Sequence, residues 1–211
     1  MPKITNISKQ KNNKDRCNLY VDDNFYAGVS LEIVVMFRLK IGEEIDVEQL
    51  KTVIFEADKS DALNKALCYI SRSIKTKREI KEYLLKKGFS EEIVWYCIDK
   101  LKEYDYVNDV EYSKKYIEST KKTQGKNLSR FKLMNKGVKK EDIESALLDS
   151  DINFIENAKI LAEKYLKNKE KTKENFIKAY KYLICRGFSY EEADSAISQL
   201  KEGRVEEWSE Y

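Results

Sequence analysis

The chain of 211 residues contains no histidine, and this absence removes much of the chemistry that enzymes use. Without imidazole there is no proton carrier that titrates near neutral pH, no catalytic pair with Cys or Ser, and no mixed Cys/His zinc site. The seven glycines never form a G-x-G-x-x-G or Walker pattern, and no cluster of aspartates suggests a two-metal centre. We therefore expect a protein that is not an enzyme and that carries no cofactor.

Long apolar runs are also missing. No stretch approaches the roughly eighteen apolar residues that a membrane span needs, and the amino-terminal residues lack the apolar core of a signal peptide. We expect a cytoplasmic protein with no membrane partner.

The chain has four cysteines and no Cys-x-x-Cys pair. Cys68, Cys97 and Cys185 lie among apolar residues at helical spacing, whereas Cys17 lies in a segment with strand-like composition. This scattered distribution predicts reduced cysteines buried in the core.

A glycine-centred pattern occurs three times along the chain. The three glycines are Gly88, Gly137 and Gly187, which are 49 and 50 residues apart. In each case a Leu lies four residues before the glycine, and a Lys or Arg lies directly before it. The Leu ends an apolar helical stripe, the cation complements the negative helix end, and Gly adopts the left-handed conformation that stops the helix. The pattern predicts an internal repeat.

A second helix is expected to begin directly after each glycine. Ser90 and Ser189 can cap this helix through their side-chain oxygens, and Ser189 with Glu192 fits a capping box. Lys139 stands at the same place in the middle repeat, which predicts that the turn there is the weakest of the three.

The first 30 residues differ from the rest of the chain because they are rich in β-branched and aromatic residues. We predict strands over 4–8, 17–21 and 25–30, with a turn at Asp22-Asp23-Asn24. A helix is expected over 31–39, and another begins near Asp46. Because an isolated hairpin is barely stable in water, this sheet must pack against those helices.

From about Asp61 onward, apolar residues recur at helical intervals and form three stripes in each repeat. The first stripe runs from Leu63 to Ile74, and the second helix of the middle repeat contributes Leu128, Leu133 and Met134. The predicted fold class is mainly α, with three tandem three-helix repeats of about 50 residues in an elongated array after a small N-terminal β-hairpin and helical region. The predicted domains are 1–60, 61–108, 109–150 and 151–211.

Positive charge concentrates in the middle of the chain. Segment 109–150 has 10 basic and 7 acidic residues, and no acidic residue lies between Ser119 and Lys140, where there are eight basic ones. Such a stretch favours an anionic partner, such as nucleic acid or an acidic protein groove, although a solvated face is the alternative. The candidate binding residues, including a cationic segment upstream, are Arg72, Lys75, Lys77, Arg78, Lys81, Lys121, Lys122, Lys126, Arg130, Lys132, Lys136, Lys139 and Lys140.

Within this set, we expect Lys121, Lys122, Lys126 and Arg130 to contribute to binding. Lys126 and Arg130 are four residues apart and should project from one side of a helix. The cation before each glycine is instead expected to complement its helix dipole, and we predict this local role for Arg186.

Several of these segments resemble a known family. Ile80-Lys-Glu-Tyr-Leu-Leu-Lys-Lys-Gly-Phe89, followed by Ile98-Asp-Lys-Leu-Lys-Glu-Tyr-Asp-Tyr-Val-Asn-Asp109 and Tyr112, resembles the signature of RecX, the regulatory protein of the RecA recombinase. Gln124-Gly125-Lys126 with Lys136-Gly137-Val138 resembles the second repeat of that family. The Tyr-Val-Asn-Asp segment is the most specific part of the likeness.

The sequence also departs from the family pattern. Asn127-Leu128-Ser129 stands where the family is often more basic, and Lys139 stands where a capping residue is commoner. The N-terminal region is similar to an extension found in longer members.

The resemblance implies a curved, non-enzymatic protein that lies in the helical groove of a RecA filament on single-stranded DNA. Family members typically inhibit filament extension, ATP hydrolysis and strand exchange. We expect a monomer. Two alternatives remain open: a stand-alone DNA-binding protein similar to a helix-turn-helix, and a helical scaffold that binds protein without nucleic acid.

Overall fold

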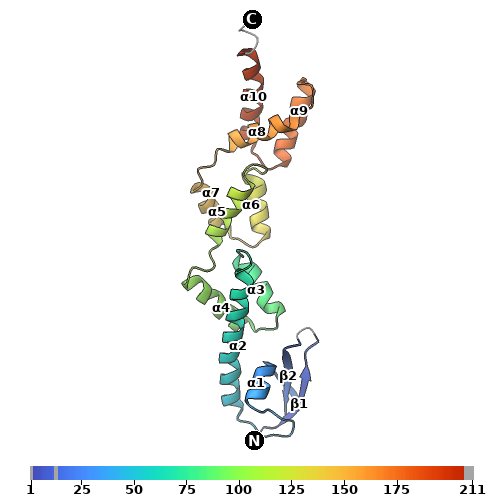
Figure 1. The fold of residues 1–211 in the computed structure, drawn as a ribbon, viewed down its shortest axis with the longest axis vertical. Helices are drawn as coiled ribbons and strands as arrows, with labels where there is room; N and C mark the ends of the chain where they lie inside the picture. Colours follow the sequence, from blue (N-terminus) through green and yellow to red (C-terminus); the bar gives the residue numbers. More distant parts are fainter. Residues whose placement is uncertain (1, 12–13, 207–211) are drawn as a thin grey trace. The chain divides into compact units, whose positions relative to one another are not determined.

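Helices dominate the structure, a computed structural model that describes residues 2–11 and 14–206 (Figure 1). Ten helices and one three-stranded sheet form in the described residues. The chain divides after Val107 into two units, the first with the sheet and the first repeat, the second with the other two repeats. The predicted mainly α fold with a small N-terminal sheet is confirmed.

The N-terminal sheet is antiparallel with strand order β1-β2-β3. Its strands are β1 (Ile4–Lys9), β2 (Arg16–Val21) and β3 (Asn24–Ser30). Asp22 and Asp23 have positive φ values of 47° and 63°, as the tight turn between β2 and β3 requires. The predicted hairpin with one preceding strand is therefore correct.

Two helices follow the sheet, α1 (Leu31–Met36) and α2 (Val47–Ile70). The Asp46 side chain caps α2 by accepting hydrogen bonds from two backbone N–H groups. α2 runs without a break across residues 60 and 61, where we placed a domain boundary. Its first half packs with the sheet core through Leu50 and Ile54, and its second half enters the next core through Ala62 and Ala66.

Each repeat contains three helices, and α2 supplies the first helix of repeat 1. The helices that follow are α3 (Lys77–Lys86), α4 (Glu91–Glu103), α5 (Asp109–Thr120), α6 (Lys126–Asn135), α7 (Lys140–Leu148), α8 (Phe154–Leu166), α9 (Lys173–Cys185) and α10 (Tyr190–Glu206). Gly88, Gly137 and Gly187 have φ values of 90°, 81° and 87°, so each ends the second helix of its repeat as predicted.

The capping predictions can be compared at the start of each third helix. Ser90 accepts a hydrogen bond from the Ile93 backbone N–H, and Ser189 with Glu192 forms both bonds of a capping box. Lys139 occupies the same position before α7 and makes no side-chain capping bond.

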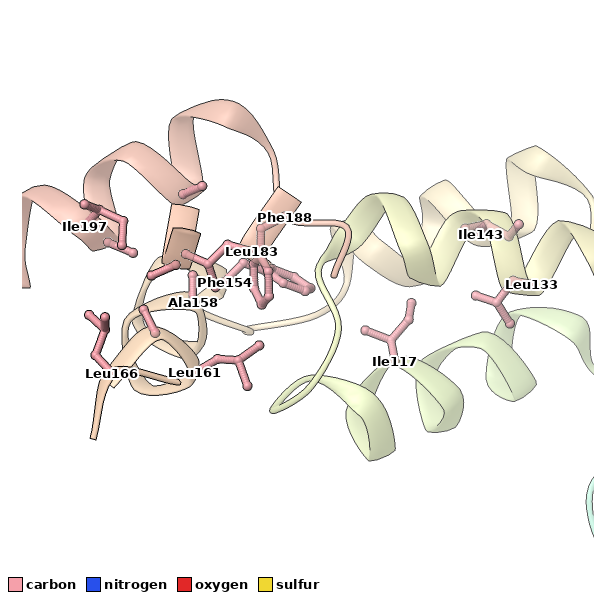
Figure 2. Close-up of a cluster of buried hydrophobic side chains, with 14 of the residues drawn as sticks. Ile117, Leu133, Ile143, Phe154, Ala158, Leu161, Leu166, Leu183, Phe188 and Ile197 are labelled. Carbon is pink, nitrogen blue, oxygen red and sulfur yellow. The ribbon is translucent and has the colours of Figure 1, made fainter. Parts of the chain in front are cut away.

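Repeats 2 and 3 share one hydrophobic core. Ile117 and Leu133 belong to the same buried cluster as Leu183 and Phe188, which come from repeat 3 (Figure 2). This continuous core makes the two repeats one folded unit.

The junction between these repeats depends on a close approach of two backbones. The Gly125 N–H donates to the Arg186 carbonyl at 2.9 Å, and the Asn127 N–H donates to the Gly187 carbonyl at 2.9 Å. A Cβ at Gly125 would lie 2.3 Å from the Phe188 nitrogen, so only glycine fits there. The amino end of α6 is thereby fixed against the turn before α10.

Four residues predicted to lie in the core are exposed. Ile74 lies beyond the end of α2 and is 50% exposed, and Met134 is 53% exposed because it faces away from the core on α6. Cys17 and Cys97 are buried, whereas Cys68 and Cys185 are exposed because they fall on the outer faces of α2 and α9. Burial raises the pKa of the Cys97 thiol to about 11.

The described residues include no helix with the length and apolar character that crossing a membrane requires.

Candidate functional site

The predicted cations of unit 1 begin in the loop between α2 and α3. Arg72 is exposed in this loop, and Lys75 follows it with its ammonium 4.9 Å from the centroid of the Tyr69 ring. Lys77 is the first residue of α3 and is half-buried. Lys75 is therefore engaged by an aromatic ring, whereas Arg72 faces solvent.

The other two cations of unit 1 lie on α3, and both have carboxylate partners. Arg78 pairs with Glu82 one turn later at 2.7 Å. Lys81 lies 3.5 Å from Glu91 and 4.7 Å from the centroid of the Trp95 ring on α4. Because an exposed pair exchanges with solvent at little energetic cost, Arg78 stays accessible to a partner, whereas Lys81 is half-buried between its two contacts.

In unit 2, Arg130 is half-buried and connects two helices. Its Nε and one terminal nitrogen donate to the two oxygens of Glu144 on α7, at 2.7 and 2.9 Å, and the other terminal nitrogen donates to Asn127. This bond from Arg130 holds the pKa of the Glu144 carboxyl below its ordinary value. A bidentate pair of this geometry orients α6 on α7.

Lys126 also has an internal role. Its ammonium lies 3.3 Å from Glu192, a buried side chain of α10, and 5.0 Å from the centroid of the Phe154 ring. Lys126 and Arg130 line a cavity of about 630 Å³ together with Glu191 and Glu192. These two carboxylates offset the positive charge of Lys126 and Arg130, so the cavity does not favour the binding of an anion.

The cations of the middle repeat therefore fall into two groups. Lys121 pairs with Glu118, and Lys136 lies 5.7 Å from the centroid of the Tyr112 ring. Four others are exposed and have no ion-pair partner within the residues that the structure describes. We call them the open lysines: Lys122, Lys132, Lys139 and Lys140.

Two of the open lysines occupy positions that are unfavourable for a cation. Lys139 is the N-cap of α7 and Lys140 is its first residue. The amino end of a helix carries partial positive charge, so a cation there costs about 0.3–1 kcal/mol. Repeat 1 has Ser90 and Glu91 at the same two positions. Repeat 2 thus has two lysines at positions where helix stability favours other residues.

The cations before the glycines pack against tyrosines, and repeats 1 and 3 share the arrangement. Tyr69 stacks on Tyr83 at 4.2 Å between ring centroids, and Lys87 lies over the Tyr83 ring. In repeat 3, Tyr165 stacks on Tyr182, and the Arg186 guanidinium lies 5.0 Å from the Tyr182 centroid. These stacks join the first two helices of each repeat, which supports a local role for Arg186.

We predict that Arg186→Glu lowers the free energy of unfolding by about 0.5–1.5 kcal/mol, because the substitution removes a favourable helix-end charge and a cation–π contact. Urea unfolding measures the change, and Arg186→Lys is the control that keeps the charge. Binding to any partner should stay within about two-fold of the wild type. A folded Arg186→Glu variant that binds tenfold more weakly would contradict the local role.

Comparison with known proteins places these features in a family. Residues 2–46 match the regulatory protein RecX N-terminal domain, and residues 62–101 match the first three-helix domain of RecX. The chain is 34% identical to the regulatory protein RecX of Clostridium botulinum strain Alaska E43, over 90% of this chain and 92% of that one. The chain belongs to the RecX family of regulatory proteins. It is also 36% identical to the regulatory protein RecX of Clostridioides difficile strain 630, over 93% and 95% of the two chains.

Solved RecX structures have the same fold. A crystal structure of regulatory protein RecX gives a TM-score of 0.63 at 27% identity, covering 92% of this chain and 98% of that chain. The crystal structure of RecX from Lactobacillus salivarius gives 0.64 at 28% identity, covering 69% and 98%. The RecX resemblance found in the sequence is confirmed.

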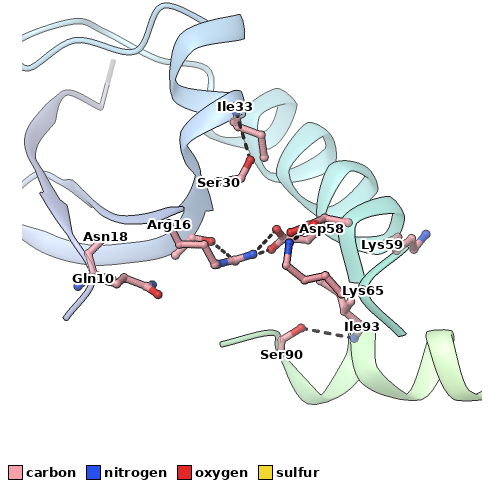
Figure 3. Close-up of polar contacts among 12 residues, drawn as sticks. Gln10, Arg16, Asn18, Ser30, Ile33, Asp58, Lys59, Lys65, Ser90 and Ile93 are labelled. Carbon is pink, nitrogen blue, oxygen red and sulfur yellow. Dashed lines mark hydrogen bonds and ion pairs between the residues drawn. The ribbon is translucent and has the colours of Figure 1, made fainter. Parts of the chain in front are cut away.

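Sequence reasoning missed a buried ion pair that joins the segment matched by the RecX N-terminal domain to α2, between the two matched segments. Arg16 points from β2 toward Asp58 on α2 and binds both carboxylate oxygens, at 2.7 and 2.8 Å (Figure 3). The same guanidinium donates to the Gly28 carbonyl and lies 4.9 Å from the centroid of the Phe89 ring. Since 42 residues separate the partners, no local pattern marks them.

Proposed function

We propose that this protein regulates a RecA-type recombinase by binding its filament on single-stranded DNA, in the filament groove. The observation that carries the proposal is membership of the RecX family over at least nine tenths of the chain in the relatives compared. The bound protein would inhibit or modulate ATP hydrolysis, strand exchange and filament growth. It acts as a cytoplasmic monomer without a cofactor, by occupancy and not by catalysis.

The open lysines support this proposal because a filament on DNA presents both phosphates and carboxylates. Lys122 and Lys132 are exposed on repeat 2, and Lys139 and Lys140 lie at a helix end that disfavours cations. Single-stranded DNA is reached through the filament. Several weak contacts to neighbouring protomers add up to firm binding when they belong to one chain.

We predict that the purified protein suppresses ATP hydrolysis by the recombinase at substoichiometric or near-stoichiometric amounts, because one bound molecule touches more than one protomer. A coupled ATPase assay with single-stranded DNA measures the effect, and a heat-denatured sample of the protein is the control. Unchanged hydrolysis at several-fold excess over recombinase would contradict the proposal.

A titration of DNA without recombinase separates this function from the helix-turn-helix alternative. Direct, sequence-selective and salt-sensitive binding to DNA alone favours the stand-alone DNA-binding protein. An effect that requires recombinase and ATP favours the filament regulator.

A further inference from the structure

The solvent-facing side of α6 carries two large apolar side chains. Phe131 is 62% exposed and Met134 is 53% exposed. Residues three apart on a helix are surface neighbours, so the two side chains form one small apolar patch. The patch lies within the stretch that contains no acidic residue.

The other two repeats show that the fold does not require an apolar residue at this place. Phe131 is six residues before Gly137, and the residues six before Gly88 and Gly187 are Glu82 and Lys181. Both of these are exposed. The fold therefore accommodates an acid and a base at the position where repeat 2 exposes an aromatic ring.

The neighbouring position differs in the same way. Lys132 is one of the open lysines, whereas its counterparts Tyr83 and Tyr182 belong to the stacked tyrosine pairs of repeats 1 and 3. At this position repeat 2 therefore has a solvent-facing cation beside Phe131, where repeats 1 and 3 have a stacked tyrosine. These two differences together give the outer face of α6 an apolar patch with a cationic edge.

We infer that Phe131, Met134 and Lys132 dock into an apolar pocket edged by carboxylates on a recombinase protomer, an inference that rests on the proposed function. Aromatic residues and Met are enriched in protein interfaces, and a buried aromatic anchor contributes a large share of the binding energy. A protein partner is favoured over a nucleobase because Met134 forms half of the patch and cannot stack as an aromatic ring does. The positive edge matches a carboxylate rim.

The test uses two opposite charges at one position, Phe131→Glu and Phe131→Lys. Each variant installs the residue type that a sister repeat already carries at that position, so both are expected to fold. If the ring fills an apolar pocket, both variants lose about tenfold or more in affinity for the filament. If only charge matters at this face, Phe131→Lys binds as well as or better than the wild type, and this result would overturn the inference.

Fluorescence anisotropy with labelled protein measures binding to recombinase filaments held by a non-hydrolysable ATP analogue, and separately to single-stranded DNA alone. The matched control is Ile177→Lys on α9, which replaces another half-exposed apolar residue on a second helix and should bind within about two-fold of the wild type. A parallel loss of affinity for DNA alone would assign the patch to base stacking and overturn protein docking. If wild-type protein binds no filament, the proposed function fails and the inference fails with it. If the wild type binds and both variants bind equally well, only the inference fails.

Discussion

Changing the four open lysines to glutamate is expected to weaken binding to the recombinase filament about 100-fold at low salt and by less at high salt. Each reversal replaces an attraction to phosphate or carboxylate with a repulsion, and both effects are screened by salt. Anisotropy titrations at two or more salt concentrations measure the affinity and its salt dependence. The variant carries Lys122→Glu, Lys132→Glu, Lys139→Glu and Lys140→Glu.

This set differs from the one that the sequence favoured. Reversal of Lys126 would place two acids beside each other at Glu192, and reversal of Arg130 would do the same at Glu144. A loss of binding in such a variant would mix a lost contact with a disturbed fold. Of the four binding residues predicted from the sequence, only Lys122 is exposed and has no ion-pair partner in the described residues.

The open lysines reduce this ambiguity because Lys139 and Lys140 lie at the amino end of their own helix. Glu144, whose pKa Lys140 also lowers, keeps its bidentate bond with Arg130. Glutamate at positions 139 and 140 lies at the amino end of α7, where negative charge is favourable by about 0.3–1 kcal/mol. The quadruple variant should therefore unfold at nearly the same urea concentration as the wild type. Weaker binding then reports the lost contact and not a loss of structure.

A control with the same change in net charge separates local contact from general electrostatics. Four exposed lysines of repeat 3 suit this purpose, since none has an ion-pair partner in the described part of the chain: Lys164, Lys167, Lys173 and Lys181. Their reversal should weaken filament binding less than tenfold. Equal losses from the two quadruple variants would show that the filament responds to net charge alone, and the open lysines would then be a solvated face.

Features that depend on neighbouring residues could be predicted from the sequence. Gly88, Gly137 and Gly187 were found from a local pattern, because ending a helix depends on the few residues around its last turn. The caps at Ser90 and Ser189 were predictable for the same reason. The order of strands and helices follows from such local rules.

Pairing between distant segments was not predictable. Nothing near Arg130 in the sequence indicates that Glu144 lies across from it, and Glu192 is 66 residues after Lys126. Counting charges in the stretch without acids therefore gives too many unpaired cations, because acids from α7 and α10 pair with two of them. The exposure of a residue within an apolar helical stripe could not be predicted either. Periodicity places Met134 near the core face of α6, but the packing of the helices leaves it exposed to solvent.

The buried pair of Arg16 and Asp58 carries the largest expected effect on stability. Both side chains are less than a tenth exposed, and the guanidinium contacts β3 and the Phe89 ring as well as α2. Arg16→Ala is expected to lower the free energy of unfolding of unit 1 by about 3–5 kcal/mol, because Asp58 is left as an unpaired buried charge. Urea unfolding with hydrogen exchange read out in β2 and α2 measures the loss.

Two further variants decide whether charge pairing is the cause. Replacing both partners with apolar residues, Arg16→Met with Asp58→Leu, should restore most of the lost stability, because no buried charge then lacks a partner. Arg78→Ala, which breaks the exposed pair with Glu82 on α3, should lower stability by less than about 1 kcal/mol. If Arg16→Ala is no more destabilising than Arg78→Ala, Asp58 must reach solvent after the substitution. The sheet would then be held on α2 by its apolar contacts alone, through Leu50 and Ile54.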